Sequence, residues 1–145
     1  MTTRRKRAYM AIPMSTLDVR KLDSRILVID DESMILDTVK MILEDLGCVV
    51  DTASDPLDGI ERAIAGCYDL VITDIRMPVR DGSEVIEAVL AVKPRTRMLV
   101  MTAWPDDPRA ARALKSGAIG LLKKPFEVSS VLSFLARDQG SVTTD

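Results

Sequence analysis

The 145-residue sequence contains no histidine. This absence excludes nucleophile systems in which a histidine activates a serine or cysteine, and it excludes metal sites built on imidazole. The chain itself also cannot be a phosphohistidine donor. Any chemistry must therefore depend on carboxylates, hydroxyl groups and lysine.

Cysteine and long apolar runs are also scarce. The two cysteines, Cys48 and Cys67, have no metal-ligand spacing, and we expect both to be small apolar fillers in a reduced, cytoplasmic protein. No apolar stretch approaches the roughly 18 residues that a membrane helix needs. The sequence has no G-x-G-x-x-G or P-loop stretch, which argues against nucleotide binding.

Charge is distributed unevenly along the chain. Residues 1–25 carry seven of the 20 positive residues and two of the 22 acidic ones, which leaves that segment at +5 and the remainder at −7. No signal-peptide apolar stretch follows the RRKR cluster at 4–7. We predict a flexible basic leader over 1–24, one domain over 25–138 and a tail over 139–145, and we expect no direct binding to nucleic acid.

From residue 25 onward, short apolar runs alternate with segments of helical spacing. The predicted strands are 26–29, 48–52, 68–73, 96–101 and 119–122, and the predicted helices are 33–46, 56–65, 83–92, 108–116 and 126–137. Strict alternation of this kind is typical of an α/β fold, a doubly wound parallel sheet with helices on both faces. The chain stops soon after the last predicted helix, so we expect no second domain after it.

Four of the predicted strands are followed by functional side chains. The first leads into Asp30 and Asp31, and the others into Asp74, Thr102 and Lys124. Functional groups gather at the carboxyl ends of the strands in such a sheet. Three carboxylates about 5 Å apart would repel one another by roughly 3 kcal/mol per pair at an effective dielectric of about 20. A Mg²⁺ ion would relieve this repulsion, and the hydroxyl and ammonium groups suit a phosphoryl group.

The residues alone leave some roles open. Asp74 ends the central strand and is the best candidate for a carboxylate that itself accepts a phosphoryl group, whereas Asp30 and Asp31 suit metal binding. Taken singly, each aspartate can be a helix N-cap or loop residue, and Asp31 could cap the first helix. Thr102 alone could lie at the edge of the core, and Lys124 alone could be a solvated surface residue.

Four motifs together resemble the receiver domain of bacterial two-component response regulators, the CheY-like family. They are ILVIDDE at 26–32, DLVITDIRMPVRDG at 69–82, MTA at 101–103 and GAIGLLKKPF at 117–126. The resemblance covers about residues 25–137. It implies a five-stranded (βα)5 sheet with strand order 2-1-3-4-5.

The resemblance also implies the roles of the site residues. Asp74 is expected to be phosphorylated, and Asp31 and Asp74 are expected to bind Mg²⁺ together with the backbone carbonyl of Arg76. Asp30 would hold the ion through water, and Thr102 and Lys124 would contact the phosphoryl group. The donor would be a histidine kinase or a histidine phosphotransfer protein. A downstream protein would dock on the surface formed by the helix at 108–116, the strand at 119–122 and the last helix, and a homodimer through the same elements stays open.

One position departs from the family pattern. Leu121 stands where family members usually have Tyr or Phe, an aromatic residue that turns inward when the threonine moves toward the phosphoryl group. Arg76 and Trp104, each two residues past a site residue, are bulky, and in the family such positions tune how readily water reaches the acyl phosphate.

Three functions compete on these observations. The first is a phosphoacceptor switch, a signalling domain and not an enzyme with a substrate of its own. The second is a protein-binding module of the same fold that ignores phosphorylation, which Leu121 favours. The third is a Mg²⁺-dependent phosphatase with an aspartyl nucleophile, but haloacid-dehalogenase-like enzymes need a second acid where this chain has Arg76.

Overall fold

The computed structural model describes residues 23–125 and 127–143, with side chains described up to Ala136. The predicted leader therefore lies outside the described residues apart from Asp23 and Ser24, and so do residues 144–145 of the predicted tail. Within the described part of the chain, no helix combines the length and apolar character that crossing a membrane requires.

Five parallel strands form one sheet in the order β2-β1-β3-β4-β5. This arrangement confirms the predicted fold class and strand order. The bounds are β1 Arg25–Ile29, β2 Val49–Ala53, β3 Leu70–Asp74, β4 Met98–Thr102 and β5 Gly120–Lys123.

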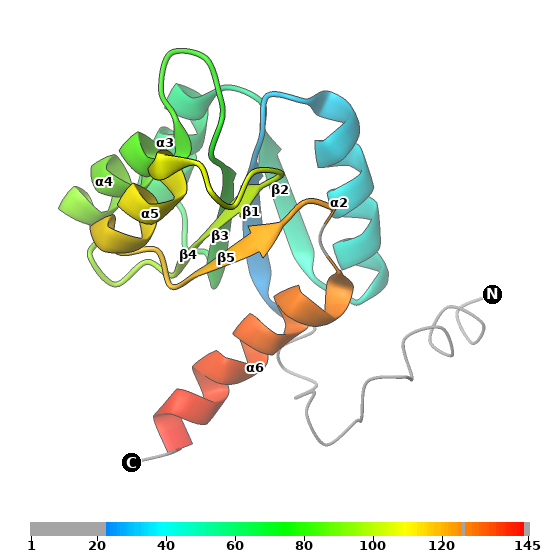
Figure 1. Cartoon of the computed structure of the whole chain (residues 1–145). Coiled ribbons are helices and arrows are strands. Elements are labelled where there is room, and N and C mark those ends of the chain that lie inside the picture. The colour runs from blue at the N-terminus through cyan, green and yellow to red at the C-terminus, as the bar shows by residue number, and fades with distance from the viewer. Residues whose placement is uncertain (1–22, 126, 144–145) are drawn as a thin grey trace.

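Helices cover both faces of the sheet, as Figure 1 shows, with α2 and α6 on one side and α3, α4 and α5 on the other. Their bounds are α2 Ser33–Asp45, α3 Pro56–Ala65, α4 Gly82–Val92, α5 Pro108–Ser116 and α6 Val128–Thr143. In β1, Ile26 and Val28 face the core under α2 and α6, while Leu27 and Ile29 face the core under the other three helices. The strands read as continuous apolar runs because both of their faces are buried.

Aspartate caps and prolines begin two of the helices. Asp55 precedes Pro56 at the start of α3, and Asp107 precedes Pro108 at the start of α5, and each carboxylate accepts a hydrogen bond from the first turn. These local signals are the reason that both helix starts were predictable. The alternative in which Asp31 caps the first helix does not hold, because the N-cap of α2 is Glu32, which makes no side-chain cap bond.

Two further expectations need correction. The last helix ends at Thr143 rather than near residue 137, so most of the predicted tail is helical. Cys48 is buried in the core as predicted, but Cys67 is exposed, because it follows the Gly66 that ends α3. Both cysteines are free thiols.

Candidate functional site

The strand register brings the predicted site residues to one edge of the sheet. Ile29 pairs with Thr73 and Asp74 pairs with Met101, so Asp30 leaves the sheet beside Asp74. Thr102 pairs with Lys123, the residue before Lys124. Asp30 and Thr102 are fully buried and Asp74 is 5% exposed, whereas Asp31 is exposed.

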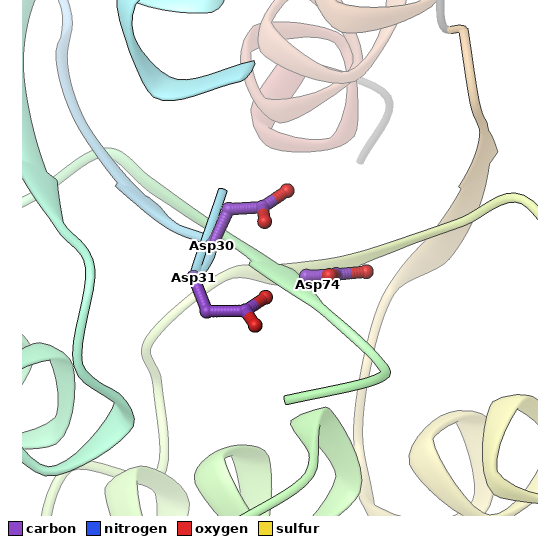
Figure 2. Close-up of side chains that lie close together, drawn as sticks. All are labelled: Asp30, Asp31 and Asp74. Atoms are coloured by element: carbon purple, nitrogen blue, oxygen red, sulfur yellow. The ribbon is translucent and has the colours of Figure 1, made fainter. Parts of the chain in front are cut away.

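The three predicted carboxylates form a cluster. Asp30, Asp31 and Asp74 each offer an oxygen atom, and these atoms lie within 4.8 Å of one another. Figure 2 shows Asp30 and Asp31 leaving the end of β1 and Asp74 leaving the end of β3, with their carboxylates pointing the same way. A set of hard oxygen donors, one of them at the solvent boundary, is typical of a Mg²⁺ site in which the ion keeps several waters.

Lys124 lies among these acids. Its Nζ atom is 2.9 Å from Asp30 Oδ2, 3.2 Å from Asp74 Oδ1 and 3.7 Å from Glu32 Oε1. Burial by itself would lower the pKa of this lysine, but its hydrogen bond to Asp30 and the attraction of Asp74 outweigh that effect and raise the pKa. The structure therefore places a permanent positive charge between two buried carboxylates.

The positive charge of Lys124 does not balance the cluster. Burial raises the pKa of Asp74 to about 6, and the negative charge of Asp30 adds to this effect. Lys124 and the hydrogen bond that the Ile75 amide donates to Asp74 Oδ1 at 2.9 Å oppose it only in part. Near neutral pH, Lys124 thus neutralises the ionised Asp74 only in part. A divalent cation would supply the remaining positive charge.

Thr102 presents a hydroxyl group at the same edge. Its Oγ1 atom accepts a hydrogen bond from the Trp104 amide at 2.9 Å. A hydroxyl that accepts one bond in this way still has its own hydrogen to donate. The Lys124 amide also donates to the Thr102 carbonyl at 2.7 Å, which ties the ends of β4 and β5 together.

The loop after β3 approaches Asp74 closely. The Gly82 amide donates to the carbonyl of Ile75 at 2.9 Å. A Cβ atom at Gly82 would collide with the backbone carbonyl of Asp74. Glycine at position 82 therefore lets the start of α4 pack directly against the backbone of Asp74 and Ile75.

Two acidic residues near the site escaped sequence reasoning. Glu32 reaches Lys124 from the solvent side. Asp107 caps α5 and also binds the Arg76 side chain, with 2.9 Å between Arg76 Nε and Asp107 Oδ2. No sequence signal reveals this pair, since the partners stand 31 positions apart in two different loops.

Leu121 occupies the position where the family usually has an aromatic residue. It is half-buried in β5, pairs with Val100 in the sheet register, and packs against the core under α3, α4 and α5. Leucine therefore contributes to this core in the structure. The predicted effect of Leu121 on switching stays a prediction.

An apolar groove runs beside the site on the face of α2. Its volume is about 580 Å³. It is lined by Met34, Ile35, Thr38, Val39, Ile42, Met101, Ala103, Lys124 and Pro125. The groove thus connects the exposed side of α2 with the Lys124–Pro125 turn.

The chain is similar to known signalling proteins over most of its length. A family model described as the response regulator receiver domain matches residues 26–136. The transcriptional regulatory protein DltR of Streptococcus agalactiae is 36% identical over 109 residues, 75% of this chain and 49% of that protein. The transcriptional regulatory protein FixJ of Bradyrhizobium diazoefficiens is 37% identical over 105 residues, 70% of this chain and 50% of that protein. The chain spans about half the length of these curated relatives.

Solved structures have the same fold. The chemotaxis protein CheY4 of Vibrio cholerae is 31% identical, with a TM-score of 0.71, over 79% of this chain and 97% of that one. The receiver domain of a sensor histidine kinase from Pseudomonas aeruginosa PAO1 is 25% identical, with a TM-score of 0.72, over 79% of this chain and 95% of that one. That structure has a magnesium ion coordinated in its active site cleft.

Proposed function

Because the chain belongs to the family of response regulator receiver domains, we propose that Asp74 accepts a phosphoryl group in a two-component phosphorelay. The protein is a phosphoacceptor signalling domain rather than a classical enzyme. The observation that carries the proposal is the gathering of Asp30, Asp31 and Asp74 around one sheet edge together with Lys124. A purely structural edge has no reason to collect three acids, since they repel one another.

Mg²⁺ is the proposed ion. Asp31, Asp74 and the backbone carbonyl of Arg76 would bind it directly, and Asp30 would hold it through water. The raised pKa of Asp74 supports this assignment, because a nearby cation would stabilise the ionised carboxylate that must act as nucleophile. The bound ion would neutralise charge on the phosphoryl oxygens during transfer.

The chain's own residues would do the rest of the chemistry. The ionised Asp74 oxygen forms a bond to phosphorus while the bond from phosphorus to the donor breaks, which leaves an acyl phosphate on Asp74. Lys124 and the hydroxyl of Thr102 would hold the outer oxygens of the group. The donor would be a phosphohistidine outside these 145 residues or a small acyl phosphate, because the 145 residues contain no histidine.

A histidine kinase or a histidine phosphotransfer protein is the proposed partner, in the cytoplasm. We propose that its histidine-bearing segment docks on the apolar groove of α2, which ends at Lys124 and Pro125 beside Asp74. Output through α5, β5 and α6, by a downstream protein or by a homodimer, stays a prediction. The curated relatives are about twice as long as the matched region, so single-domain signalling is also a prediction.

A second candidate is a receiver-fold binding module whose docking ignores phosphorylation. Leu121 favours it, because leucine fills less space than the usual aromatic residue and so distinguishes two packings less well. The two candidates differ in whether phosphorylation changes the affinity for a partner.

The proposed phosphorylation has a direct test. Incubation with acetyl phosphate and Mg²⁺ should give one acid-stable, base-labile acyl phosphate, detected as a mass increase and mapped by peptide mass spectrometry. Asp74→Asn should abolish it, whereas Asp30→Asn should only slow it. Labelling of Asp74→Asn to the wild-type extent would show that another carboxylate is the acceptor.

A further inference from the structure

The side chain of Arg76 belongs to the loop that leaves the proposed phosphoryl site, and it is paired with Asp107. It begins two residues after Asp74 and donates a hydrogen bond from Nε to Asp107 Oδ2 at 2.9 Å. Its Cζ atom lies 5.2 Å from the centroid of the Trp104 ring. The side chain is 50% exposed, so it has room to move.

Asp107 does not depend on Arg76 for a partner. Its Oδ1 atom accepts hydrogen bonds from Arg109 N and Nε at 2.9 and 3.1 Å, and its Oδ2 atom accepts one from Arg109 Nη2 at 2.8 Å. If Arg76 left, this carboxylate would still be paired, which avoids the usual cost of an isolated buried charge. Two guanidinium groups share one carboxylate here, so one positive charge of the trio is in excess.

Backbone hydrogen bonds connect this trio to Thr102. The Trp104 amide donates to Thr102 Oγ1 at 2.9 Å, and the Trp104 carbonyl accepts from the Asp107 amide at 3.0 Å. Asp107 is in turn the N-cap of α5. A change at Thr102 or Arg76 is therefore passed directly to the first turn of this helix.

We propose that Arg76 is a further phosphoryl-binding residue, which exchanges Asp107 for the phosphoryl oxygens when Asp74 is phosphorylated. This inference rests on the proposed phosphorylation of Asp74. A phosphoryl group brings up to about two negative charges, whereas Asp107 offers one that Arg109 already neutralises. Guanidinium groups bind phosphate oxygens through paired, charge-assisted hydrogen bonds. On exchange, Trp104 loses its stacked cation and α5 loses one of the two arginines at its N-cap.

Beryllofluoride, a phosphoryl mimic, provides the test in the full chain with Mg²⁺. Arg76→Gln should weaken beryllofluoride binding about tenfold, the value of one charge-assisted hydrogen bond. It should also diminish the accompanying change in Trp104 fluorescence. Arg76→Lys should restore part of the beryllofluoride affinity.

The Asp107→Asn variant frees Arg76 from its carboxylate partner without removing the helix cap, so it tests the release of Arg76 alone. Asparagine keeps the N-cap but competes weakly for the arginine, so beryllofluoride should bind about threefold more tightly. The matched control is Asp106→Asn, which removes an equal charge at the exposed neighbouring residue and should have less effect. In the Arg76→Gln background, Asp107→Asn should no longer tighten binding.

The results distinguish failure of this inference from failure of the proposed function. If Arg76→Gln binds beryllofluoride as well as the wild type does, or if the effect of Asp107→Asn persists without Arg76, the inference is wrong. A wild-type chain that neither binds beryllofluoride nor forms an acyl phosphate would instead overturn the proposed function, and this inference with it.

Discussion

Asp74 and Asp107 are two aspartates with little exposure, 5% and 9%, in neighbouring parts of the molecule. Burial and the charge of Asp30 raise the pKa of Asp74 to about 6. For Asp107, the hydrogen bonds from Arg109 and then from Arg76 hold the pKa well below its usual range. Nearby cations therefore neutralise the carboxylate of Asp74 only in part, whereas two arginines more than neutralise that of Asp107. The carboxylate that its cations neutralise only in part is the proposed phosphoryl acceptor, and the fully neutralised one serves as an anchor.

The largest expected effect comes from removing Lys124, the cation that contacts Asp74. Lys124→Met should lower the free energy of unfolding at pH 7 without Mg²⁺ by about 3 kcal/mol, because it leaves two buried carboxylates without their ammonium partner. Urea unfolding followed by circular dichroism measures this loss. Equal stability of the variant and the wild type would mean that Lys124 is not paired in solution.

Removing the negative charge of Asp74 should instead raise the free energy of unfolding. Asp74→Asn should stabilise the protein by about 2 kcal/mol at pH 7 without Mg²⁺, since the asparagine needs no counter-charge. The same urea experiment with Mg²⁺ supplies the control, because the ion should stabilise the wild type much more than the variant. A variant that is less stable than the wild type without Mg²⁺ would contradict the account.

The pH dependence follows from the raised pKa of Asp74. A carboxyl group whose pKa is higher in the folded than in the unfolded state binds its proton more tightly when folded, so its contribution is present at low pH and is lost as pH rises. Without Mg²⁺, wild-type stability should fall by about 3 kcal/mol, through this group alone, between its unfolded value near pH 4 and pH 7. The difference in free energy of unfolding between the wild type and Asp74→Asn across this range isolates the contribution of Asp74. A difference that does not change with pH would refute the prediction.

The anchor should behave as an ordinary structural residue. Asp107→Ala removes the N-cap of α5 and the shared partner of two arginines, and we expect the melting temperature to fall by roughly 5 °C with no dependence on Mg²⁺. Asp55→Ala at the start of α3 is the matched cap control. A loss at position 107 that Mg²⁺ reverses would place Asp107 within the metal site and remove the distinction drawn here.

The smallest effect on stability is expected at Leu121. This residue tests whether a change at Thr102, beside Asp74, alters the conformation of the segment that contains Asp107. Leu121→Tyr should increase the changes in hydrogen exchange over residues 103–126 on beryllofluoride binding, because an aromatic ring fills the space left by a moving Thr102 more completely. The gain in burial is about 1–2 kcal/mol in the active state. If the wild type already shows the full response and the tyrosine variant matches it, Leu121 is only a packing substitution.

The fold was predictable because its signals are local. Each strand is an apolar run, and Asp55-Pro56 and Asp107-Pro108 begin helices through their own backbone contacts. The core of the candidate site was predictable because Asp74 and Thr102 end their strands, Asp30 and Lys124 directly follow theirs, and the parallel register aligns the strand ends.

What escaped prediction depends on contacts between loops. The pairing of Arg76 with Asp107 and the approach of Gly82 to the Asp74 carbonyl are set by the three-dimensional path of the chain. The alternative cap at Asp31 does not form for a local reason. The amide of Glu32 donates instead to Asp30 Oδ1 at 2.9 Å, and α2 begins one residue later.

The central claim is that Lys124 offsets only part of the negative charge at Asp74 and Asp30, and that a divalent cation supplies the remaining positive charge. Carboxyl carbon NMR of the full chain, titrated with and without Mg²⁺, measures this directly, with Asp74→Asn and Asp107→Asn assigning the two signals. We predict that Asp74 titrates near pH 6 without Mg²⁺ and at clearly lower pH with it, while Asp107 stays ionised throughout. An Asp74 signal that titrates at an ordinary aspartate pH and does not respond to Mg²⁺ would contradict the account.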